Sequence, residues 1–350
     1  MRVLRVWYYL LSNVGNGMAA GRQADKLFRF QVMRVLNEIG LFDFLETPRT
    51  YGQLLTEFGF VDTDYTREVF ETLCSDKEKV ILKENNLYRR NFDQPVPTRE
   101  TVLKNTDKRI ADFLLMAEGM VETMPNRLRD EPVELSESFE QNGRQMLTKF
   151  DKVLGNKIYS AMRRAAFSFL TNDDRAWLEG KHLLDVGCGS GRETAEIWVR
   201  HNGNIQITAI DPIAGMLELA EQNFPAILHE LEPDHPPLNQ KNAPLFKQAS
   251  ATKLPFPDNS FDAAFWLFVL HWTPNPRRAI SECVRVVKPG GLIFGIQSFR
   301  PEINPFTNLV IRTNENCYGG FWREDYRGWF RENGVEVDIA TPAGAFRAQL

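Results

Sequence analysis

Residues 183–191 restrict the fold of this chain more than any other segment. A short apolar strand that also holds Asp185 runs into Gly187-Cys188-Gly189-Ser190-Gly191, in which glycine occupies alternate positions. Glycine lets the backbone turn tightly and approach a ligand where any Cβ would collide. The helix that follows offers unpaired N–H groups, which favour a carboxylate or a phosphate. This pattern predicts a ligand site at the carboxyl end of a strand.

From Lys181 onward, short apolar strands alternate with helical segments. Such alternation predicts an α/β domain with a doubly wound, mostly parallel sheet. We expect the proline-rich stretch 223–245 to be a surface insertion. The expected strands are 182–186, 206–210, 245–249, 263–267, 292–297 and 335–339, and the expected helices are 192–200, 215–223 and 277–287.

The N-terminal part predicts a mainly helical, winged-helix-like domain. Apolar residues recur at spacings of three between Ala24 and Ile39, which predicts a helix that Gly40 ends. Two further helices are expected at 52–58 and 64–73. A hairpin follows, with strands at 80–82 and 87–89 around an Asn85-Asn86 turn.

We expect three regions along the chain. Residues 1–95 form the winged-helix-like domain, which would serve dimerisation or substrate binding. Residues 96–175 form a helical connector, with a linker at 94–107 and helices at 110–129 and 146–170. Residues 176–350 form the sheet domain. The apolar run Val6–Leu11 is too short to span a bilayer, so we expect it to pack on the fold and expect no integral membrane segment.

The charge balance weighs against a nucleic-acid partner. The net charge is −4, and the helix 64–73 carries the lone basic residue Arg67 against three acids. We interpret Arg163 and Arg164 as a solvated helix face. The four cysteines are widely spread and form no metal-ligand cluster, so we expect a reducing, cytoplasmic location and no metal.

A dinucleotide site would use a similar glycine loop, but two features oppose it here. Its fingerprint needs a small third residue where this chain has Arg192, and no Gly-Lys-Ser/Thr of a triphosphate site follows. Asp185 instead suits a ligand with an ammonium group. Asp211 ends the next strand, from which a carboxylate can accept both hydroxyls of a ribose.

These residues resemble class I S-adenosylmethionine-dependent methyltransferases, from about Lys181 to the C-terminus. The resemblance implies a seven-stranded Rossmann-like sheet, S-adenosyl-L-methionine as cofactor and S-adenosyl-L-homocysteine as product. More diffusely, residues 36–43 and 87–89 resemble the winged-helix dimerisation domain of small-molecule O-methyltransferases, which implies a homodimer through this domain. The segments that carry the first resemblance are 185–191, Asp211, 251–262, 269–271 and 285–291.

The resemblance also implies the cofactor contacts. Asp185 and the Gly187–Gly191 loop would hold the amino-acid portion, and Asp211 with Pro212 the ribose. Met216 would pack on the adenine, Ser250-Ala251 would face its edge, and Trp266-Leu267 would border the reacting methyl. The implied cofactor-binding set is Asp185, Gly187, Cys188, Gly189, Gly191, Asp211, Pro212, Met216, Ser250, Ala251, Trp266 and Leu267.

The acceptor side leaves alternatives open. His271 would deprotonate or orient the acceptor, or it caps the strand end and packs beside Trp272. Aromatic residues at Tyr318, Phe321 and Trp322 would line a substrate pocket with a glycine-hinged lid, or they fill a core. His271-Trp272 resembles both the base-bearing stretch of plant phenol methyltransferases and the His-His pair of quinone-pathway C-methyltransferases.

Three classes of function follow. The first is an enzyme that methylates oxygen or carbon of a small aromatic, quinone-like or otherwise hydrophobic acceptor. The second is a regulatory protein that binds S-adenosylmethionine without methylating anything. The third, a nucleic-acid methyltransferase, lacks the Asn/Asp-Pro-Pro-aromatic motif and a Pro-Cys nucleophile.

Overall fold

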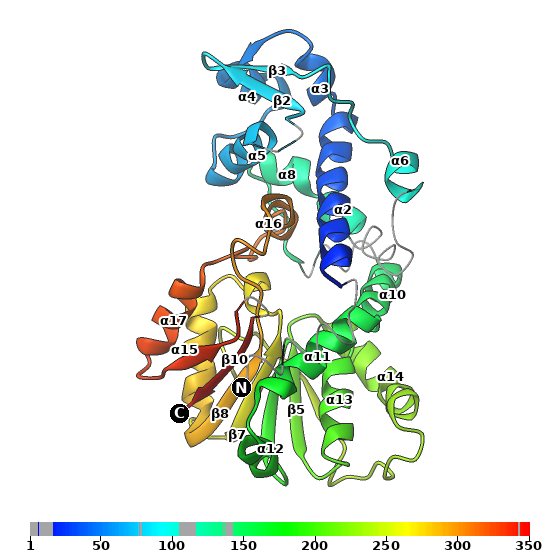
Figure 1. The fold of residues 1–350 in the computed structure, drawn as a ribbon, viewed down its shortest axis with the longest axis vertical. Coiled ribbons are helices and arrows are strands. Elements are labelled where there is room, and N and C mark those ends of the chain that lie inside the picture. Colours follow the sequence, from blue (N-terminus) through cyan, green and yellow to red (C-terminus); the bar gives the residue numbers. More distant parts are fainter. Residues whose placement is uncertain are drawn as a thin grey trace. The chain divides into compact units, whose positions relative to one another are not determined.

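The chain divides into two compact units (Figure 1). The computed structural model describes residues 6, 17–75, 77, 79–104, 117–135, 137, 143–341 and 344–350, with the side chains of 17–25, 143–146 and 158 left out. The sheet unit comprises Met1–Met18, Gly143–Glu302 and Gly320–Leu350, and the helical unit comprises Ala19–Asn142 and Ile303–Gly319.

A seven-stranded sheet in the order β6-β5-β4-β7-β8-β10-β9 forms the centre of the sheet unit. Neighbours from β6 to β8 run parallel, whereas β10 runs antiparallel to both β8 and β9. The predicted doubly wound, mostly parallel sheet is therefore confirmed. The strands are β4 (His182–Val186), β5 (Gln206–Asp211), β6 (Leu245–Gln248), β7 (Phe261–Leu267), β8 (Val287–Ile296), β9 (Val337–Ile339) and β10 (Ala345–Gln349).

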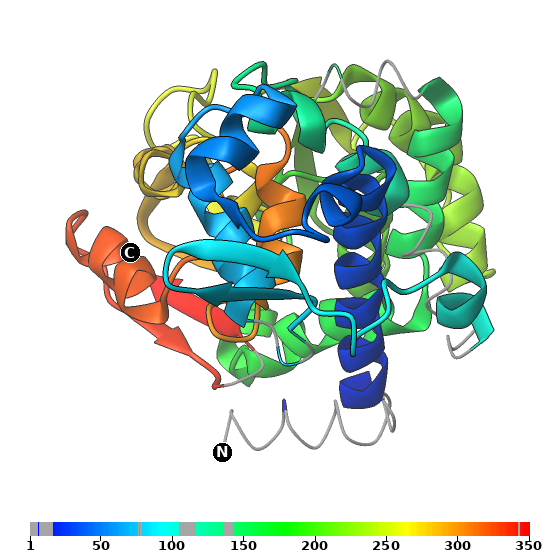
Figure 2. The ribbon, with the colours of Figure 1, turned by 90° about the horizontal axis from the view of Figure 1, so that it is seen from above.

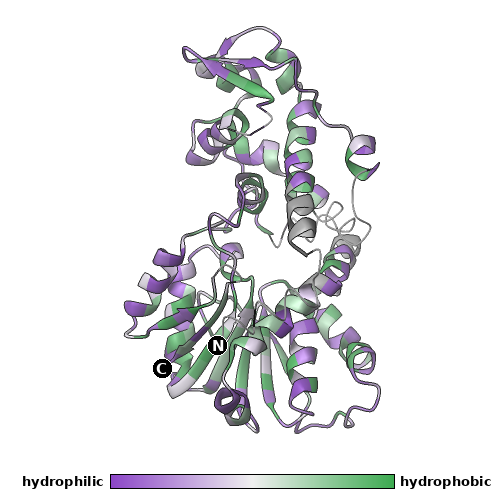
Figure 3. Cartoon of the chain, viewed as in Figure 1, coloured by the Kyte–Doolittle hydropathy of each residue, from purple (hydrophilic) through white to green (hydrophobic). Residues whose placement is uncertain are grey.

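Both faces of this sheet are buried, and successive residues of a strand alternate between them. Leu183 packs in the cluster that includes α11, α13 and α14, whereas Leu184 packs in the cluster that includes α15 and α17. Burial on both faces explains why the strands are nearly continuous apolar runs, which Figure 3 shows in green. The helices are α11 (Lys157–Phe169), α13 (Arg192–Arg200), α14 (Ala214–Leu231), α15 (Pro276–Val286) and α17 (Arg323–Arg331).

Two predictions about the sheet unit are corrected. The expected insertion 223–245 begins as helix, because α14 continues through Pro225 to Leu231 with Phe224 buried. The expected helix 146–170 is two helices, α10 (Gly143–Leu154) and α11, and with α12 (Asn172–Trp177) they belong to the sheet unit. The expected boundary at residue 176 is therefore wrong, since these helices do not form a separate connector.

The helical unit starts with α2 (Gly17–Glu38), which buries Leu27, Phe30, Met33 and Leu36 as the spacing predicts. Gly40 follows with φ of 82°, a conformation that suits glycine. Figure 2 shows this unit from above, with the hairpin in cyan. Its other elements are α3 (Leu41–Phe44), β1 (Arg49–Thr50), α4 (Tyr51–Phe58), α5 (Asp64–Ser75), β2 (Ile81–Glu84), β3 (Leu87–Arg90), α6 (Arg99–Lys104), α8 (Met124–Leu128) and α16 (Pro305–Arg312).

The predicted hairpin is confirmed. Asn85 and Asn86 have φ of 49° and 65°, as a two-residue turn with both central residues left-handed requires. Strand β1, which the sequence did not reveal, pairs with β3 to give the order β1-β3-β2. The expected linker 94–107 contains helix α6, and part of the expected helix 110–129 lies outside the described residues.

Residues 303–319 join the helical unit although the sequence places them after β8. The Tyr65 hydroxyl on α5 donates a hydrogen bond to Leu309 O at 3.0 Å, and Glu68 on the same helix pairs with Arg312. Asn308 Nδ2 also donates to Glu68 at 2.6 Å. The expected domain 176–350 is therefore interrupted by a segment that packs elsewhere.

Of the N-terminal apolar run, only Val6 lies among the described residues. Its side chain is fully buried in the core of the sheet unit, which agrees with packing on the fold. In the described part of the chain, no helix combines the length and apolar character needed to cross a bilayer.

Candidate functional site

Backbone geometry explains the alternate glycines after β4. Gly187, Gly189 and Gly191 all have positive φ, at 69°, 52° and 81°. A Cβ on Gly187 would lie 2.6 Å from Val269 Cγ2, and one on Gly189 would lie 3.1 Å from Leu154 Cδ1. Side chains at these positions would therefore be both strained and crowded. The loop brings bare backbone to the carboxyl edge of the sheet, where ligands bind in such folds.

Asp211 lies at the end of the neighbouring strand and is fixed against this loop. Its Oδ2 accepts a hydrogen bond from Gly189 N at 3.0 Å, and its Oδ1 accepts one from Ile213 N at 2.9 Å. Burial raises the pKa of the carboxyl to about 6, although both backbone donors favour the charged form. Each oxygen keeps a free lone pair, so the side chain can still accept a ligand hydroxyl.

Asp185 is the second buried acid of the site, with 1% of its surface exposed. Thr194 Oγ1 on α13 donates to its Oδ2 at 2.6 Å. Burial above all, with smaller contributions from the charges of Glu193 and Asp211, raises the pKa of Asp185 to about 8. Among the described residues no cationic side chain pairs with this carboxyl, so the site fits a ligand that supplies a cation.

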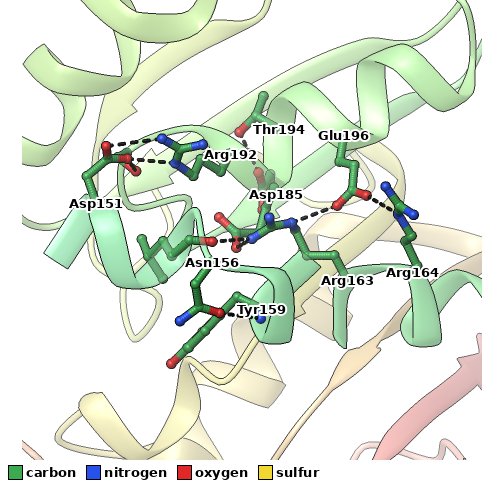
Figure 4. A network of polar contacts seen from close by, with 12 residues as sticks. Asp151, Asn156, Tyr159, Arg163, Arg164, Asp185, Arg192, Thr194 and Glu196 are labelled. Atoms are coloured by element: carbon green, nitrogen blue, oxygen red, sulfur yellow. Dashed lines mark hydrogen bonds and ion pairs between the residues drawn. The ribbon is translucent and has the colours of Figure 1, made fainter. Parts of the chain in front are cut away.

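A buried ion-pair network joins α10 and α11 to α13 beside the glycine loop (Figure 4). Arg163 Nε donates to Glu196 at 2.6 Å, and its Nη1 donates to Glu193 at 3.1 Å and to Leu154 O at 2.8 Å. Arg163 is 4% exposed, so its interpretation as part of a solvated helix face is wrong. Arg164 remains half-exposed and pairs with Glu196.

Asp151 connects α10 to the glycine loop. It accepts hydrogen bonds from Ser190 Oγ at 2.6 Å and from Arg192 Nε at 2.9 Å. Arg192, whose size argues against a dinucleotide site, therefore points its side chain toward α10. Because Leu154 also lies over Gly189, helix α10 forms part of the wall of this loop.

His271 and Gln297 lie beyond the ends of the adjacent strands β7 and β8. His271 belongs to the short 3-10 helix η2 (Leu270–Trp272), is 6% exposed and lies beside Trp272, with 5.0 Å between ring centroids. Its Nδ1 lies 3.0 Å from Gln297 Nε2. Burial lowers the pKa of His271 to about 3, so the ring is neutral at physiological pH.

The residues predicted near the adenosine differ in their availability. Met216 is buried in the first turn of α14, and Pro212 is exposed after β5. The Ser250 hydroxyl lies 2.9 Å from Thr252 Oγ1, beside the buried Ala251. Cys188 packs in the hydrophobic core, and its N–H donates to Ile210 O.

The residues predicted beside the reacting methyl and the acceptor differ in burial. Trp266 is fully buried against Phe330 and Phe346, and Leu267 packs in the opposite core cluster. Phe321 is likewise a core residue, 2% exposed. Trp272 is half-buried, and Tyr318 and Trp322 are exposed at 47% and 50%.

The comparisons with known proteins agree with this geometry. Residues 184–295 match the family model described as a methyltransferase domain. A demethylmenaquinone methyltransferase of Renibacterium salmoninarum is 28% identical over 154 residues, covering 44% of this chain and 56% of that protein. One of Bacillus licheniformis is 31% identical over 163 residues, covering 45% and 64%. The matches therefore span less than two thirds of these relatives' own lengths.

Solved structures extend the likeness to nearly the whole chain. The CurJ carbon methyltransferase has a TM-score of 0.70 at 16% identity, covering 97% of this chain and 94% of that one. An O-methyltransferase family protein from Burkholderia thailandensis has a TM-score of 0.54 at 16% identity and covers 97% of both. At such low identities the similarity defines the fold. Residues 184–295 are thus similar to a methyltransferase domain, and the chain shares its fold with these solved methyltransferases.

Proposed function

We propose that the sheet unit binds S-adenosyl-L-methionine and transfers its methyl group to a small-molecule acceptor, releasing S-adenosyl-L-homocysteine. The observation that carries this proposal is the pair of buried acids, Asp185 and Asp211, on adjacent strands around a bare-backbone loop. A buried carboxyl with a raised pKa gains from a ligand cation, and an acid at the end of the next strand suits a ribose.

The chain's own residues would divide the work as follows. Asp185 and the backbone of Gly187–Gly191 would hold the charged amino-acid end, and Asp211 would accept the ribose hydroxyls. Met216 and Ala251 offer apolar surface for the base. The cofactor supplies an electrophilic methyl on a good leaving group, so the protein's contribution is mainly alignment of the acceptor.

The acceptor class is proposed from the relatives and from the exposed aromatic residues. The relatives are named for a demethylated quinone, and CurJ is named as a carbon methyltransferase. We propose an aromatic, quinone-like or otherwise hydrophobic acceptor that is methylated on oxygen or carbon. In the sheet unit, Trp272 and Trp322 keep apolar surface that such an acceptor could cover, and in the helical unit Tyr318 is an exposed aromatic residue of the kind proposed for substrate binding.

The helical unit and the cellular setting complete the proposal. The order helix, strand, two helices and hairpin supports a winged-helix-like assignment, and we propose that this unit serves dimerisation or substrate binding. Analytical ultracentrifugation tests the dimer. Four unpaired cysteines, two of them buried, support a reducing cytoplasmic location.

Turnover assays test the enzymatic proposal. The full chain is incubated with S-adenosylmethionine and a panel of hydroquinones, phenols and 1,3-diketones, and both S-adenosylhomocysteine and the methylated product are measured by mass spectrometry. We expect Asp211→Asn to lose turnover and Asp234→Asn, an exposed aspartate of the same unit, to keep it. Cofactor binding without turnover on any acceptor would favour the regulatory alternative.

A further inference from the structure

Gln297 is a buried polar residue beside the site, and its hydrogen bonds define a specific role for it. It follows β8 directly, is fully buried, and its side-chain amide reaches three groups. Its Oε1 accepts a hydrogen bond from Leu270 N at 3.2 Å, and its Nε2 donates to Ser298 O at 3.2 Å. The same Nε2 lies 3.0 Å from His271 Nδ1. One side chain therefore ties the strand end to the histidine turn.

The hydrogen-bond chemistry of these contacts fixes the orientation of the amide. A backbone N–H can only donate, so the Gln297 atom that faces Leu270 N must be oxygen. A backbone carbonyl can only accept, so the atom that faces Ser298 O must be the NH₂ group. Both contacts require the same orientation, which places a donor against His271 Nδ1. In a neutral imidazole whose Nδ1 accepts, the proton is on Nε2.

The other ring nitrogen of His271 is free for a ligand. Among the described residues Nε2 has no hydrogen-bond partner, and it is not fully closed off from solvent. His271 is also tied to the glycine loop. Val269, two residues before the histidine in the sequence, packs against Gly187 of that loop.

No charged side chain that the structure describes competes for this ring. Burial is the sole cause of its lowered pKa. Helix α15 packs against the histidine turn. Its charged residues are engaged elsewhere, since Glu282 binds Arg278 and Arg285, and Arg277 binds Glu332.

We propose that Gln297 is a positioning residue that holds His271 as the neutral Nε2–H tautomer, so that His271 donates a hydrogen bond to the acceptor instead of removing its proton. This inference rests on the proposed methyl transfer and deepens it by naming the acceptor class. A donor stabilises negative charge on oxygen. The matching acceptor is one that ionises readily by itself, such as an enolisable 1,3-dicarbonyl compound or an acidic phenol.

The transfer then balances without a protein base. The acceptor gives its proton to water before the reaction and carries one negative charge, held by His271 Nε2–H. An electron pair of the anion forms the new bond to the methyl carbon as the carbon–sulfur bond breaks. That bonding pair goes to sulfur, so a sulfonium and an anion become a neutral thioether and a neutral product. The histidine ends in the protonation state in which it began.

Nitrogen-15 NMR of the histidine rings tests the tautomer without any turnover. The full chain is labelled at its five histidines, and the His271 signals are those that His271→Gln removes. We expect Nδ1 of His271 to be unprotonated and Nε2 to carry the hydrogen from pH 8 down to pH 5. Protonated Nδ1 in the neutral ring, or a His271 cation at pH 5, would overturn the inference.

Two variants of Gln297 extend the test to function. Gln297→Glu places a carboxylate that can accept from Nδ1–H, which favours the opposite tautomer and leaves Nε2 free to take a proton. Gln297→Leu removes all three contacts and serves as the matched control for lost packing and hydrogen bonding. We expect the Nδ1–H tautomer in Gln297→Glu alone, and wild-type tautomer signals in that variant would contradict the role of the amide.

The kinetic readout compares acceptors of different acidity. In the wild type, we expect kcat/KM to rise with pH as each acceptor ionises. No further change in the pH profile should arise from deprotonation of a protein base. In Gln297→Glu, the preference for a 1,3-diketone over an unactivated phenol should fall by about tenfold. An unchanged preference would refute the donor role. Failure of every acceptor with intact tautomer signals would reject the proposed enzyme activity, while the NMR result for Gln297 would stand.

Discussion

Replacing Asp185 by asparagine separates the function of this acid from its cost to the fold. The pKa of the carboxyl is about 8 in the folded chain, against about 3.9 in an unfolded one. Between these values the folded state keeps a proton that the unfolded state has lost. The stability of the ligand-free protein therefore falls as the pH rises through this window, by up to about 1.4 kcal/mol per unit.

An asparagine has no such ionisation to suppress, and its amide oxygen can still accept from Thr194 Oγ1. Asp185→Asn should therefore be more stable than the wild type by about 4 kcal/mol at pH 7, and by about 1.5 kcal/mol at pH 5. The same variant should lose affinity for S-adenosylhomocysteine, because an amide cannot neutralise the ammonium group of the ligand.

Urea denaturation of both proteins at the two pH values, followed by tryptophan fluorescence, measures this difference directly. The sheet unit contains the buried Trp198 and Trp266, which report on its unfolding. A variant no more stable than the wild type at pH 7, or a gap of equal size at pH 5, would refute the reasoning about the buried acid.

Three further predictions concern the same site. Binding of S-adenosylhomocysteine at pH 7 should release close to one proton from Asp185, seen as a dependence of calorimetric heat on the ionisation enthalpy of the buffer. Gly187→Ala should lower stability by at least about 1 kcal/mol more than Gly334→Ala, because both have positive φ but only the first meets Val269; equal melting shifts would contradict this. Arg163→Met should cost about 3–5 kcal/mol in denaturation, since Glu193 and Glu196 lose their partner, and Arg164→Met about 0–1 kcal/mol; similar losses would disprove the buried network.

Local sequence pattern was sufficient for the parts of the site that one strand and its following loop create. The glycine positions and Asp211 could be read because each depends on its own strand end, and parallel strands bring such ends to one edge. Positive φ at Gly187, Gly189 and Gly191 confirms why these residues alternate.

The pattern failed where a face or a tertiary partner decides the role of a residue. Trp266 lies one residue before the end of β7, and the alternation of side chains along a strand turns it into the core with Phe330. Arg163 is a buried partner of Glu193 and Glu196, a pairing across 30 or more residues that local spacing does not reveal. Gln297 offered a usable signal, since a polar residue directly after a buried strand points to a site.

Strand β10 shows a similar limit for the fold. It is a five-residue strand at the C-terminus that contains Arg347, and that charge is accommodated because the guanidinium pairs with Asp174 at 2.6 Å. A charged residue in a short run obscures a strand until its partner is known.

Calorimetric titration of the full chain with S-adenosyl-L-homocysteine tests the central claim most directly. We predict saturable binding to one site per chain, lost in Asp211→Asn and kept in Asp234→Asn. Absence of any binding heat at several temperatures, with a protein whose unfolding transition is intact, would contradict the assignment of the Asp185 and Asp211 edge as a cofactor site.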